Sequence, residues 1–310
     1  FLIASIGCIV AQAIESLLYW RFIQGLGSSA GFVIPGAIIF DLYTKERAAT
    51  VLGVYNSIIT IVIAGAPMIG SDLHIYYGWR ANFVFVGVFA LAAFLLVLLG
   101  LKESLPVKNR QSMHLPTILK NFGMLLTNRQ TILTLTIVCA IFGAFLVYIA
   151  NLSLLFINHL NVDEKIYAFY QGAVLAIFAA VSLTVSSWIR MIGMHRTKLL
   201  GQLFSIIGAV ALLIVAMVQP QSPLLITLCM CIFTAGFALM INMVFGDYMS
   251  VFPEMKGISS AMMTGIRLFT SALSIAIVSS FFNGTIVPVA IFVIFACAIA
   301  TIAMIMYALD

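Results

Sequence analysis

Long apolar runs separated by short polar stretches are the dominant pattern of this chain. The run at 83–101, for example, contains no polar side chain. A helix needs about 20 mostly apolar residues to cross a bilayer, whereas a membrane β-strand would show about ten residues of alternating polarity. The pattern therefore predicts membrane-spanning helices near 1–14, 17–40, 51–73, 82–101, 131–157, 167–189, 199–218, 223–245, 257–282 and 287–309.

The composition agrees with a chain that is solvated by lipid. Of its 310 residues 63% are hydrophobic and 8% are charged, and the mean hydropathy is +1.18. A water-soluble domain has about a quarter of its residues charged. We therefore expect an all-α integral membrane protein that crosses the bilayer many times.

The basic residues are unevenly distributed between the connections, which predicts the orientation of the chain. Cytoplasmic connections hold most of the Lys and Arg in membrane proteins. One alternating set of connections holds Lys45, Arg47, Lys102, Lys108, Arg110, Lys120, Arg129, Arg190, Arg196, Lys198 and Lys256, and the opposite set holds Arg80 and Lys165. The long connection at 102–130 is therefore predicted to be cytoplasmic. The net charge of +5 then reflects topology and does not indicate a nucleic-acid partner.

The central connection divides the spans unequally. Four predicted spans precede 102–130 and six follow it, and the sequence starts at Phe1 inside an apolar run. A transporter of two six-helix halves would have six on each side. We therefore expect an incomplete N-terminal half at 1–101, a connecting loop at 102–130 and a six-helix C-terminal half at 131–310, with the first two of twelve helices missing.

Several motifs lie at the ends and in the middle of these predicted spans. The first is Arg21-Phe-Ile-Gln24-Gly25-Leu-Gly27, and the second is Ala66-Pro67-Met-Ile-Gly70, which Gly53 precedes. Others are Asp41 followed by Arg47, Gly78-Trp79-Arg80 with Phe83, Glu103-Ser-Leu-Pro106, and the segment 253–261 (PEMKGISSA).

These motifs resemble those of the major facilitator superfamily, and within it those of the drug/proton antiporters of the bicyclomycin-resistance type. The first is similar to the family's fourth-helix motif, and the second to its fifth-helix antiporter motif, although Val62, Ala66 and Ser71 stand where the motif has glycines. The resemblance implies a proton-coupled exporter of small molecules, a cytoplasmic gate at Asp41 and Arg47, and an acidic partner for Arg21 on a helix upstream of Phe1.

Arg21 is a charged residue within an apolar segment. On insertion scales a charge at the centre of a spanning helix costs about 2.5–3.5 kcal/mol, unless it faces water or a partner. Arg21 is therefore expected to line a central cavity; the alternative is an interfacial arginine that extends outward to the membrane surface.

Small residues and one proline mark the next two predicted spans. Gly25 and Gly27 would let a neighbouring helix approach closely, and Pro67 would bend its helix because it removes a backbone donor. The resemblance implies that this bent helix seals the two halves of the transporter. Plain helix packing is the alternative.

Arg267 is a second charge deep in a predicted span, about 15 Å from Lys256 along the helix. Such a cation needs an anion or water. Three partners stay open: an acid on the absent helices, an anionic substrate, or helix carbonyls with trapped water. No Asp or Glu occupies the middle of any predicted span. A proton-coupling carboxylate would therefore lie upstream, or the coupling ion is not a proton.

The predicted span at 131–157 carries the candidate contacts of a substrate cavity. Phe142, Phe145, Tyr148 and Asn151 recur at helical spacing, and with Arg267 they would form a largely apolar site with few polar groups. Core packing is the alternative for each of them.

The sequence lacks the common motifs of enzymes and of metal sites. The sequence contains no phosphate-binding Gly-rich loop and no His-Glu-x-x-His, and its five cysteines and four histidines lack metal-ligand spacing. We therefore expect no enzyme, no cofactor and no metal. The predicted partners are a small-molecule substrate, protons and the lipid bilayer.

Three functions remain open at this point. The first is export of hydrophobic or cationic molecules by a monomer in a bacterial inner membrane. The second is uptake or exchange of an anionic metabolite, and the third is a truncated remnant without transport activity.

Overall fold

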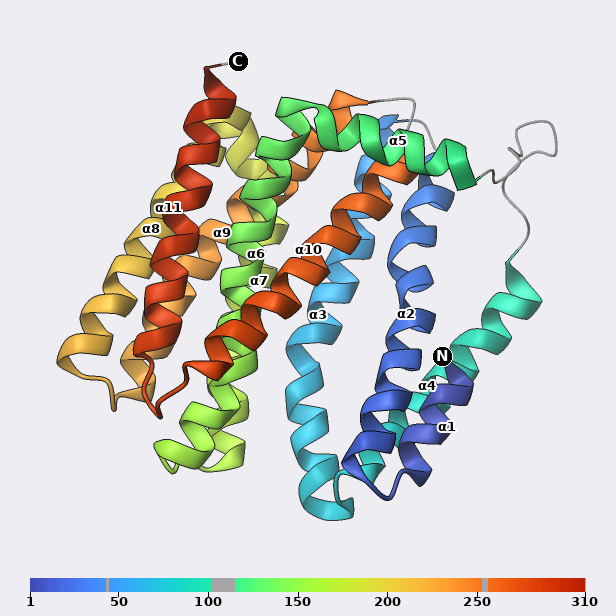
Figure 1. The fold of residues 1–310 in the computed structure, drawn as a ribbon, viewed down its shortest axis with the longest axis vertical. Helices are drawn as coiled ribbons and strands as arrows, with labels where there is room; N and C mark the ends of the chain where they lie inside the picture. The colour runs from blue at the N-terminus through green and yellow to red at the C-terminus, as the bar shows by residue number, and fades with distance from the viewer. Residues whose placement is uncertain (43–44, 102–114, 253–255, 310) are drawn as a thin grey trace. The chain divides into compact units, whose positions relative to one another are not determined.

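The computed structural model describes residues 1–42, 45–101, 115–252 and 256–309, and these are helical apart from short turns and caps (Figure 1). The helices are α1 (Leu2–Val10), α2 (Ile14–Leu42), α3 (Lys45–Tyr77), α4 (Arg80–Gly100), α5 (Leu115–Thr127), α6 (Arg129–Ser153), η2 (Leu154–His159, a π-helix), α7 (Glu164–Ile192), α8 (Met194–Val218), α9 (Pro223–Val251), α10 (Lys256–Ser280) and α11 (Val287–Ala308). The prediction of an all-helical chain is confirmed for the described residues.

Seven of the described helices are long and apolar enough to cross a membrane. The first of them is α4. The others are α6 with η2, which form one continuous span, and α7, α8, α9, α10 and α11. These seven coincide with the predicted spans from 82–101 onward. The two long helices α2 and α3 cover the predicted spans 17–40 and 51–73, and α1 covers part of 1–14.

One predicted connection contains a helix that we did not expect. The sequence predicts a loop over 102–130, but Leu115–Thr127 forms α5. Its residues Phe122 and Leu125 are three apart, which places them on one helix face. Leu125 is buried and Phe122 packs against the same core, so this apolar face supports the helix against α6 and α10.

Local signals explain where several helices begin and turn. The side chain of Asn128 accepts a hydrogen bond from the Thr131 amide at the start of α6, and Ser222 does the same for Leu225 at the start of α9. Gly193 has φ of +84° in the tight turn between α7 and α8, a conformation that other residues rarely adopt.

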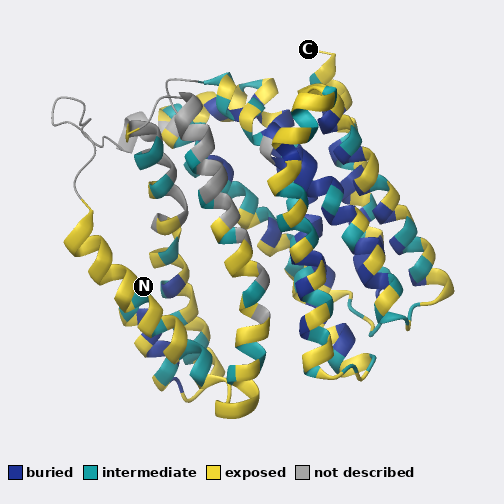
Figure 2. Ribbon diagram, turned by 180° about the vertical axis from the view of Figure 1, so that it is seen from behind, coloured by how far each residue is buried: buried dark blue, intermediate teal, exposed yellow. Residues whose placement is uncertain are grey.

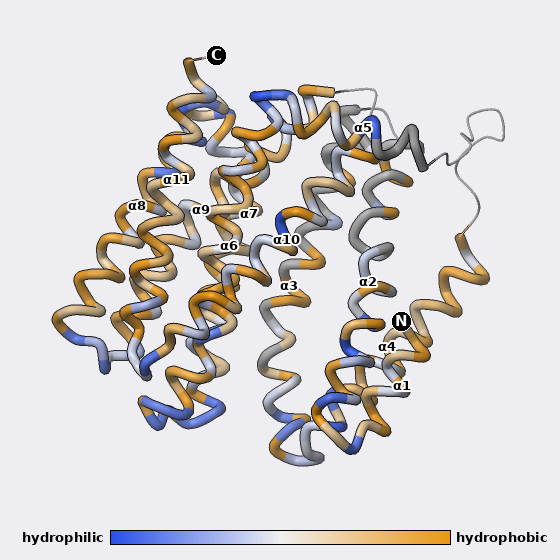
Figure 3. The backbone as a smooth tube through the Cα atoms, viewed as in Figure 1, coloured by the Kyte–Doolittle hydropathy of each residue, from blue (hydrophilic) through white to orange (hydrophobic). Residues whose placement is uncertain are grey.

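The chain divides into two units, 1–56 with 66–112 and 57–65 with 113–310. In the first unit, α1 packs against α2 and α4. In the second unit, α8 packs along α9, and α6 contacts α9, α10 and α11. Buried residues gather on the facing sides of the second unit's helices (Figure 2). Hydrophilic positions gather near helix ends and turns, as the tube coloured by hydropathy shows (Figure 3).

Candidate functional site

Arg267 of α10 lies over the ring of Phe142 from α6. The guanidinium carbon is 4.3 Å from the ring centroid, which is the geometry of a cation–π contact. The ring face carries negative charge, so Phe142 offers the cation a partner inside an apolar bundle. This pairing could not be predicted from the sequence, because the two residues are brought together by the contact between α6 and α10.

Three further phenylalanines extend this contact into an aromatic cluster. The ring centroid of Phe237 on α9 lies 6.1 Å from that of Phe142, 5.3 Å from that of Phe145 and 5.2 Å from that of Phe178 on α7. Phe145 and Phe178 are 6.1 Å apart and stacked. These distances are favourable for aromatic pairs. Arg267 and the four rings, defined here as the Arg267 cluster, come from α6, α7, α9 and α10.

One nitrogen of the Arg267 guanidinium has no hydrogen-bond partner within the described chain. Its Nε atom is buried and has no hydrogen-bond partner there. The ion pair between Lys198 and Asp247 does not involve Arg267. The three sequence alternatives for a partner of Arg267 therefore stay open.

Small hydroxyl residues line α10 beside the cluster. The hydroxyl groups of Thr270 and Ser271 donate to the carbonyl oxygen of Arg267, at 3.1 and 2.7 Å. The side chains of Ser271 and Ser274 face Gly143 on α6, where an added Cβ would lie 3.9 and 3.7 Å from their oxygens. A polar strip on α10 thus borders a position on α6 that carries no side chain.

Tyr148 and Asn151 lie deeper than the sequence analysis expects of substrate contacts. Tyr148 has no exposed surface and Asn151 is 4% exposed. The Asn151 amide nitrogen donates to the Val147 carbonyl, and the Ser279 hydroxyl donates to Asn151 Oδ1 at 3.0 Å. In this structure both residues belong to the packed core, as the packing alternative predicts.

The structure therefore brings together three of the predicted cavity residues, Phe142, Phe145 and Arg267. The sequence analysis missed Phe178 and Phe237. Each lies in an apolar span that holds several other aromatic residues, so no local pattern distinguishes them from lipid-facing residues.

The first unit holds a separate polar chain that connects α1 and α2. Arg21 donates to Gln24 Oε1 at 2.7 Å, and Gln24 Nε2 donates to the Ser5 hydroxyl at 2.8 Å. Gln24 is 3% exposed, whereas Arg21 is exposed and lies 5.7 Å from the ring of Phe83 on α4. Gln24 thus fixes α1 to α2 and also positions the Arg21 guanidinium. A role of Arg21 in a central cavity stays a prediction.

The motif glycines differ in what surrounds them. A Cβ at Gly27 would overlap the Phe1 backbone, so this glycine permits a close approach of the chain. Among the described neighbouring atoms, Gly25 has none within 4 Å of such a Cβ, and Gly70 has Asn82 Oδ1 at 3.5 Å. Ala66 is exposed on α3. The side-chain surroundings of Asp41, Arg47, Gly53 and Pro67 lie outside what the structure describes, so the predicted gate and motif roles of these residues stay predictions.

Comparison with known proteins decides the family. The model of the Major Facilitator Superfamily matches residues 1–279. The chain belongs to this family. The chain is therefore part of a membrane transporter and not of an enzyme. The match also confirms the fold that the motifs predicted.

Two curated relatives are multidrug resistance proteins. The chain is 29% identical over 192 residues to the multidrug resistance protein MdtL of Shigella dysenteriae, and 28% identical over 190 residues to MdtL of Escherichia coli O81. Each alignment covers 60% of this chain and 46% of the relative. The chain thus matches about half the length of these relatives, and the activity and substrates of the whole protein are matters for proposal.

Two solved structures share the fold. One is a partially occluded inward-open conformation of the xylose transporter XylE from E. coli, with a TM-score of 0.68, 14% identity, and coverage of 96% of this chain and 75% of that one. The other is a D-xylose-proton symporter, with a TM-score of 0.68, 17% identity, and coverage of 98% and 77%. At these identities the likeness concerns the architecture alone.

Proposed function

We propose that this chain belongs to a proton-coupled exporter of hydrophobic or cationic small molecules that works by alternating access. The observation that carries the proposal is the Arg267 cluster, in which the cation on α10 lies over Phe142 and that ring adjoins further aromatic rings from α6, α7 and α9. Apolar molecules bind through contact area and few directional bonds, and Phe142 and Phe178, the two half-buried rings of the cluster, would offer such area. The similarity to multidrug resistance proteins supports the same substrate class.

The proposal also specifies the membrane in which the protein lies and its branch of the family. We place the protein in the bacterial inner membrane as a monomer, and among the antiporters of the bicyclomycin-resistance type. Its motifs at Arg21–Gly27 and Ala66–Gly70 support that branch. The uneven distribution of basic residues supports a cytoplasmic position for the α7–α8 turn.

A second candidate function rests on the unpaired Nε atom of Arg267. A buried guanidinium without a carboxylate partner suits a substrate that carries a carboxylate or phosphate. The protein would then carry an anionic metabolite, and Arg267 would bind its charged group.

An efflux assay separates the two candidates. The full-length protein is expressed in cells without their own multidrug pumps, and the export of a lipophilic cationic dye and of bicyclomycin is followed with and without a protonophore. We expect export that stops when the proton gradient collapses, and about a tenfold loss with Phe142→Ala because substrate contact area is lost. Phe269→Ala removes a phenylalanine that is 72% exposed on α10, and it serves as the matched control.

Three results would contradict the exporter proposal. Export unaffected by Phe142→Ala would exclude the cluster as the binding site. Transport of an anionic probe that Arg267→Gln abolishes, without dye export, would favour the anion carrier. No transport by a folded full-length protein would favour an inactive remnant.

A further inference from the structure

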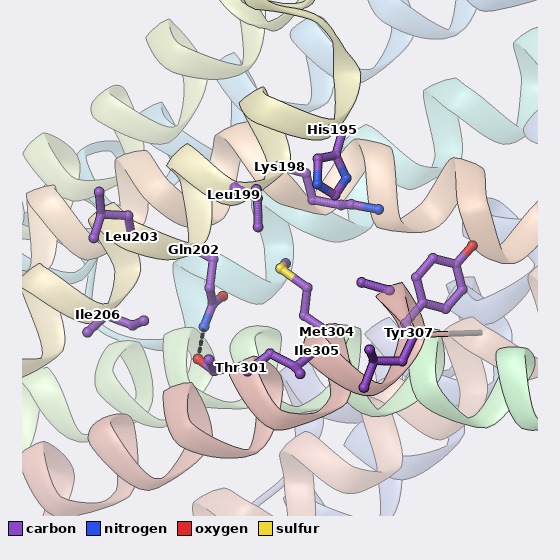
Figure 4. A pocket seen from close by; sticks show the side chains of 12 residues that line it. His195, Lys198, Leu199, Gln202, Leu203, Ile206, Thr301, Met304, Ile305 and Tyr307 are labelled. Atoms are coloured by element: carbon purple, nitrogen blue, oxygen red, sulfur yellow. Dashed lines mark hydrogen bonds between the residues drawn. The ribbon is translucent and has the colours of Figure 1, made fainter.

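A groove runs along the seam between α8 and α11 in the second unit. Its volume is about 560 Å³. One end is lined by His195, Lys198 and Tyr307, and the remainder mainly by apolar side chains such as Leu203, Ile206 and Ile305 (Figure 4). The groove lies apart from the Arg267 cluster, whose residues do not line it.

The floor and the walls of the groove differ in exposure. Lys198, Gln202 and Met304 on the floor are 8%, 3% and 6% exposed. Leu203 and Ile305 on the two walls are 52% and 57% exposed. The groove therefore opens on the side of the helix pair that the bilayer would cover, and its walls present apolar surface to whatever occupies it.

The groove has the length and polarity of one lipid leaflet. From His195 to Ile206 the α8 axis rises about 16 Å, and half of the hydrocarbon core measures about 15 Å. The charged side chains lie at the start of α8 and the apolar ones farther along it. A ligand that fits this order has an anionic or polar head followed by an extended hydrocarbon chain.

The head end of the groove carries excess positive charge. Lys198 pairs with Asp247 at 2.6 Å and lies 5.2 Å from the Tyr307 ring. Arg190 and Arg196 at the neighbouring helix ends are exposed and lie outside the groove lining, so among the described residues at this end the basic side chains outnumber the acidic Asp247. The cap residue of α8 is a glycine and offers no side-chain acceptor to the first-turn amides, which leaves the positive end of the helix dipole open to an anion.

A second polar feature of the floor points to a bound molecule. Gln202 Nε2 donates to the Thr301 hydroxyl at 2.7 Å and to the Cys297 carbonyl at 3.2 Å. These acceptors fix the amide orientation, and the Oε1 atom is left buried without a partner in the described chain. A buried acceptor of this kind is costly unless a donor reaches it.

We propose that the α8–α11 groove binds an anionic phospholipid from the leaflet on the side of the α7–α8 turn. The phosphate lies at the start of α8 beside His195 and Lys198, and one acyl chain lies between Leu203 and Ile305. Basic pockets between spanning helices on the cytoplasmic side are suited to anionic head groups. The apolar length of the groove favours a lipid over a free phosphate.

Lipid titration of the purified full-length protein in detergent tests this site. The probes are phosphatidylglycerol, phosphatidylcholine and inorganic phosphate. The readouts are the amount of bound lipid, measured by native mass spectrometry, and the thermal midpoint of unfolding. We expect phosphatidylglycerol to bind about tenfold more tightly than phosphatidylcholine, and Leu203→Trp, which fills the groove, to weaken its binding about tenfold. Ile214→Trp enlarges a side chain of similar exposure on α8 outside the groove, and it should leave binding unchanged.

Each other outcome overturns part of the proposal. Equal binding of the two lipids removes the head-group site. Stabilisation by inorganic phosphate as large as that by phosphatidylglycerol indicates a free-anion site instead. Unchanged binding in Leu203→Trp places the lipid elsewhere, and Ile305→Trp on the opposite wall gives the same test if Leu203→Trp does not fold.

Discussion

The two units of this transporter chain differ in how tightly the helices inside each unit are packed. In the second unit, described side chains from α5 to α11 form one connected apolar core that includes Tyr148, Phe233 and Phe237. In the first unit, α4 buries none of its residues, and α1 buries only small ones, such as Ala4 and Cys8. Lipid solvates exposed apolar side chains, so close packing and polar contacts decide which helices associate in a membrane.

Glycine contacts show where helices of each unit come closest. A Cβ at Gly208 of α8 would overlap the backbone of Phe233 on α9, and one at Gly236 would overlap that of Gly201. The two helices thus meet at backbone distance. In the first unit, a Cβ at Gly27 would overlap the Phe1 backbone, whereas one at Gly31 of α2 would have no described neighbouring atom within 4 Å.

The largest expected effect concerns the partly buried ion pair of the second unit. Lys198→Met should destabilise the protein by up to about 3 kcal/mol, because it leaves the partly buried Asp247 without its counter-ion. The double variant with Asp247→Asn should recover most of this loss. Thermal midpoints of the purified proteins measure both effects. A double variant as unstable as Lys198→Met alone would show that the lysine stem, and not the charge pairing, stabilises the helix ends.

The next effect compares the glycine contacts directly. Gly208→Ala should cost about 1–3 kcal/mol through overpacking, because α8 and α9 must separate to admit the methyl group. Gly31→Ala is the matched control, and it should be neutral or stabilising by up to about 1 kcal/mol, since alanine is the better helix former. Thermal unfolding in the same detergent gives both values. Equal destabilisation by the two changes would remove the distinction between the units at these positions.

The smallest effect concerns the polar chain of the first unit. Gln24→Leu removes the hydrogen bonds to Ser5 and Arg21 and should cost about 0.6–1.7 kcal/mol, the range for hydrogen bonds between membrane helices. Hydrogen exchange should rise in α1 and α2 while α8 and α9 stay protected. Faster exchange throughout the chain would mean that the two units do not unfold separately.

The sequence was sufficient to predict the helices but not the contacts between them. Apolar runs predicted the seven later spans because a continuous run of that length has one solution in a bilayer. α5 was missed because Phe122 and Leu125 are apolar in a segment whose basic residues indicate a loop. The cation–π contact of Arg267 was missed because the charge alone indicates an anion, and only tertiary packing brings Phe142 beneath it. Gly201 and Gly208 share a face of α8, but nothing local marks which helix they meet.

The close seam between α8 and α9 has a mechanical consequence. Two helices in backbone contact at Gly201, Gly208 and Gly236 cannot slide past each other without steric overlap. We therefore expect α8 and α9 to move together as one rigid body. α10 is linked to α6 through small hydroxyl side chains and the Asn151–Ser279 hydrogen bond, contacts that can break and re-form singly. Any rearrangement within the second unit during a transport cycle should therefore occur as a displacement of α10 and the Arg267 it carries, while the distance between α8 and α9 stays constant.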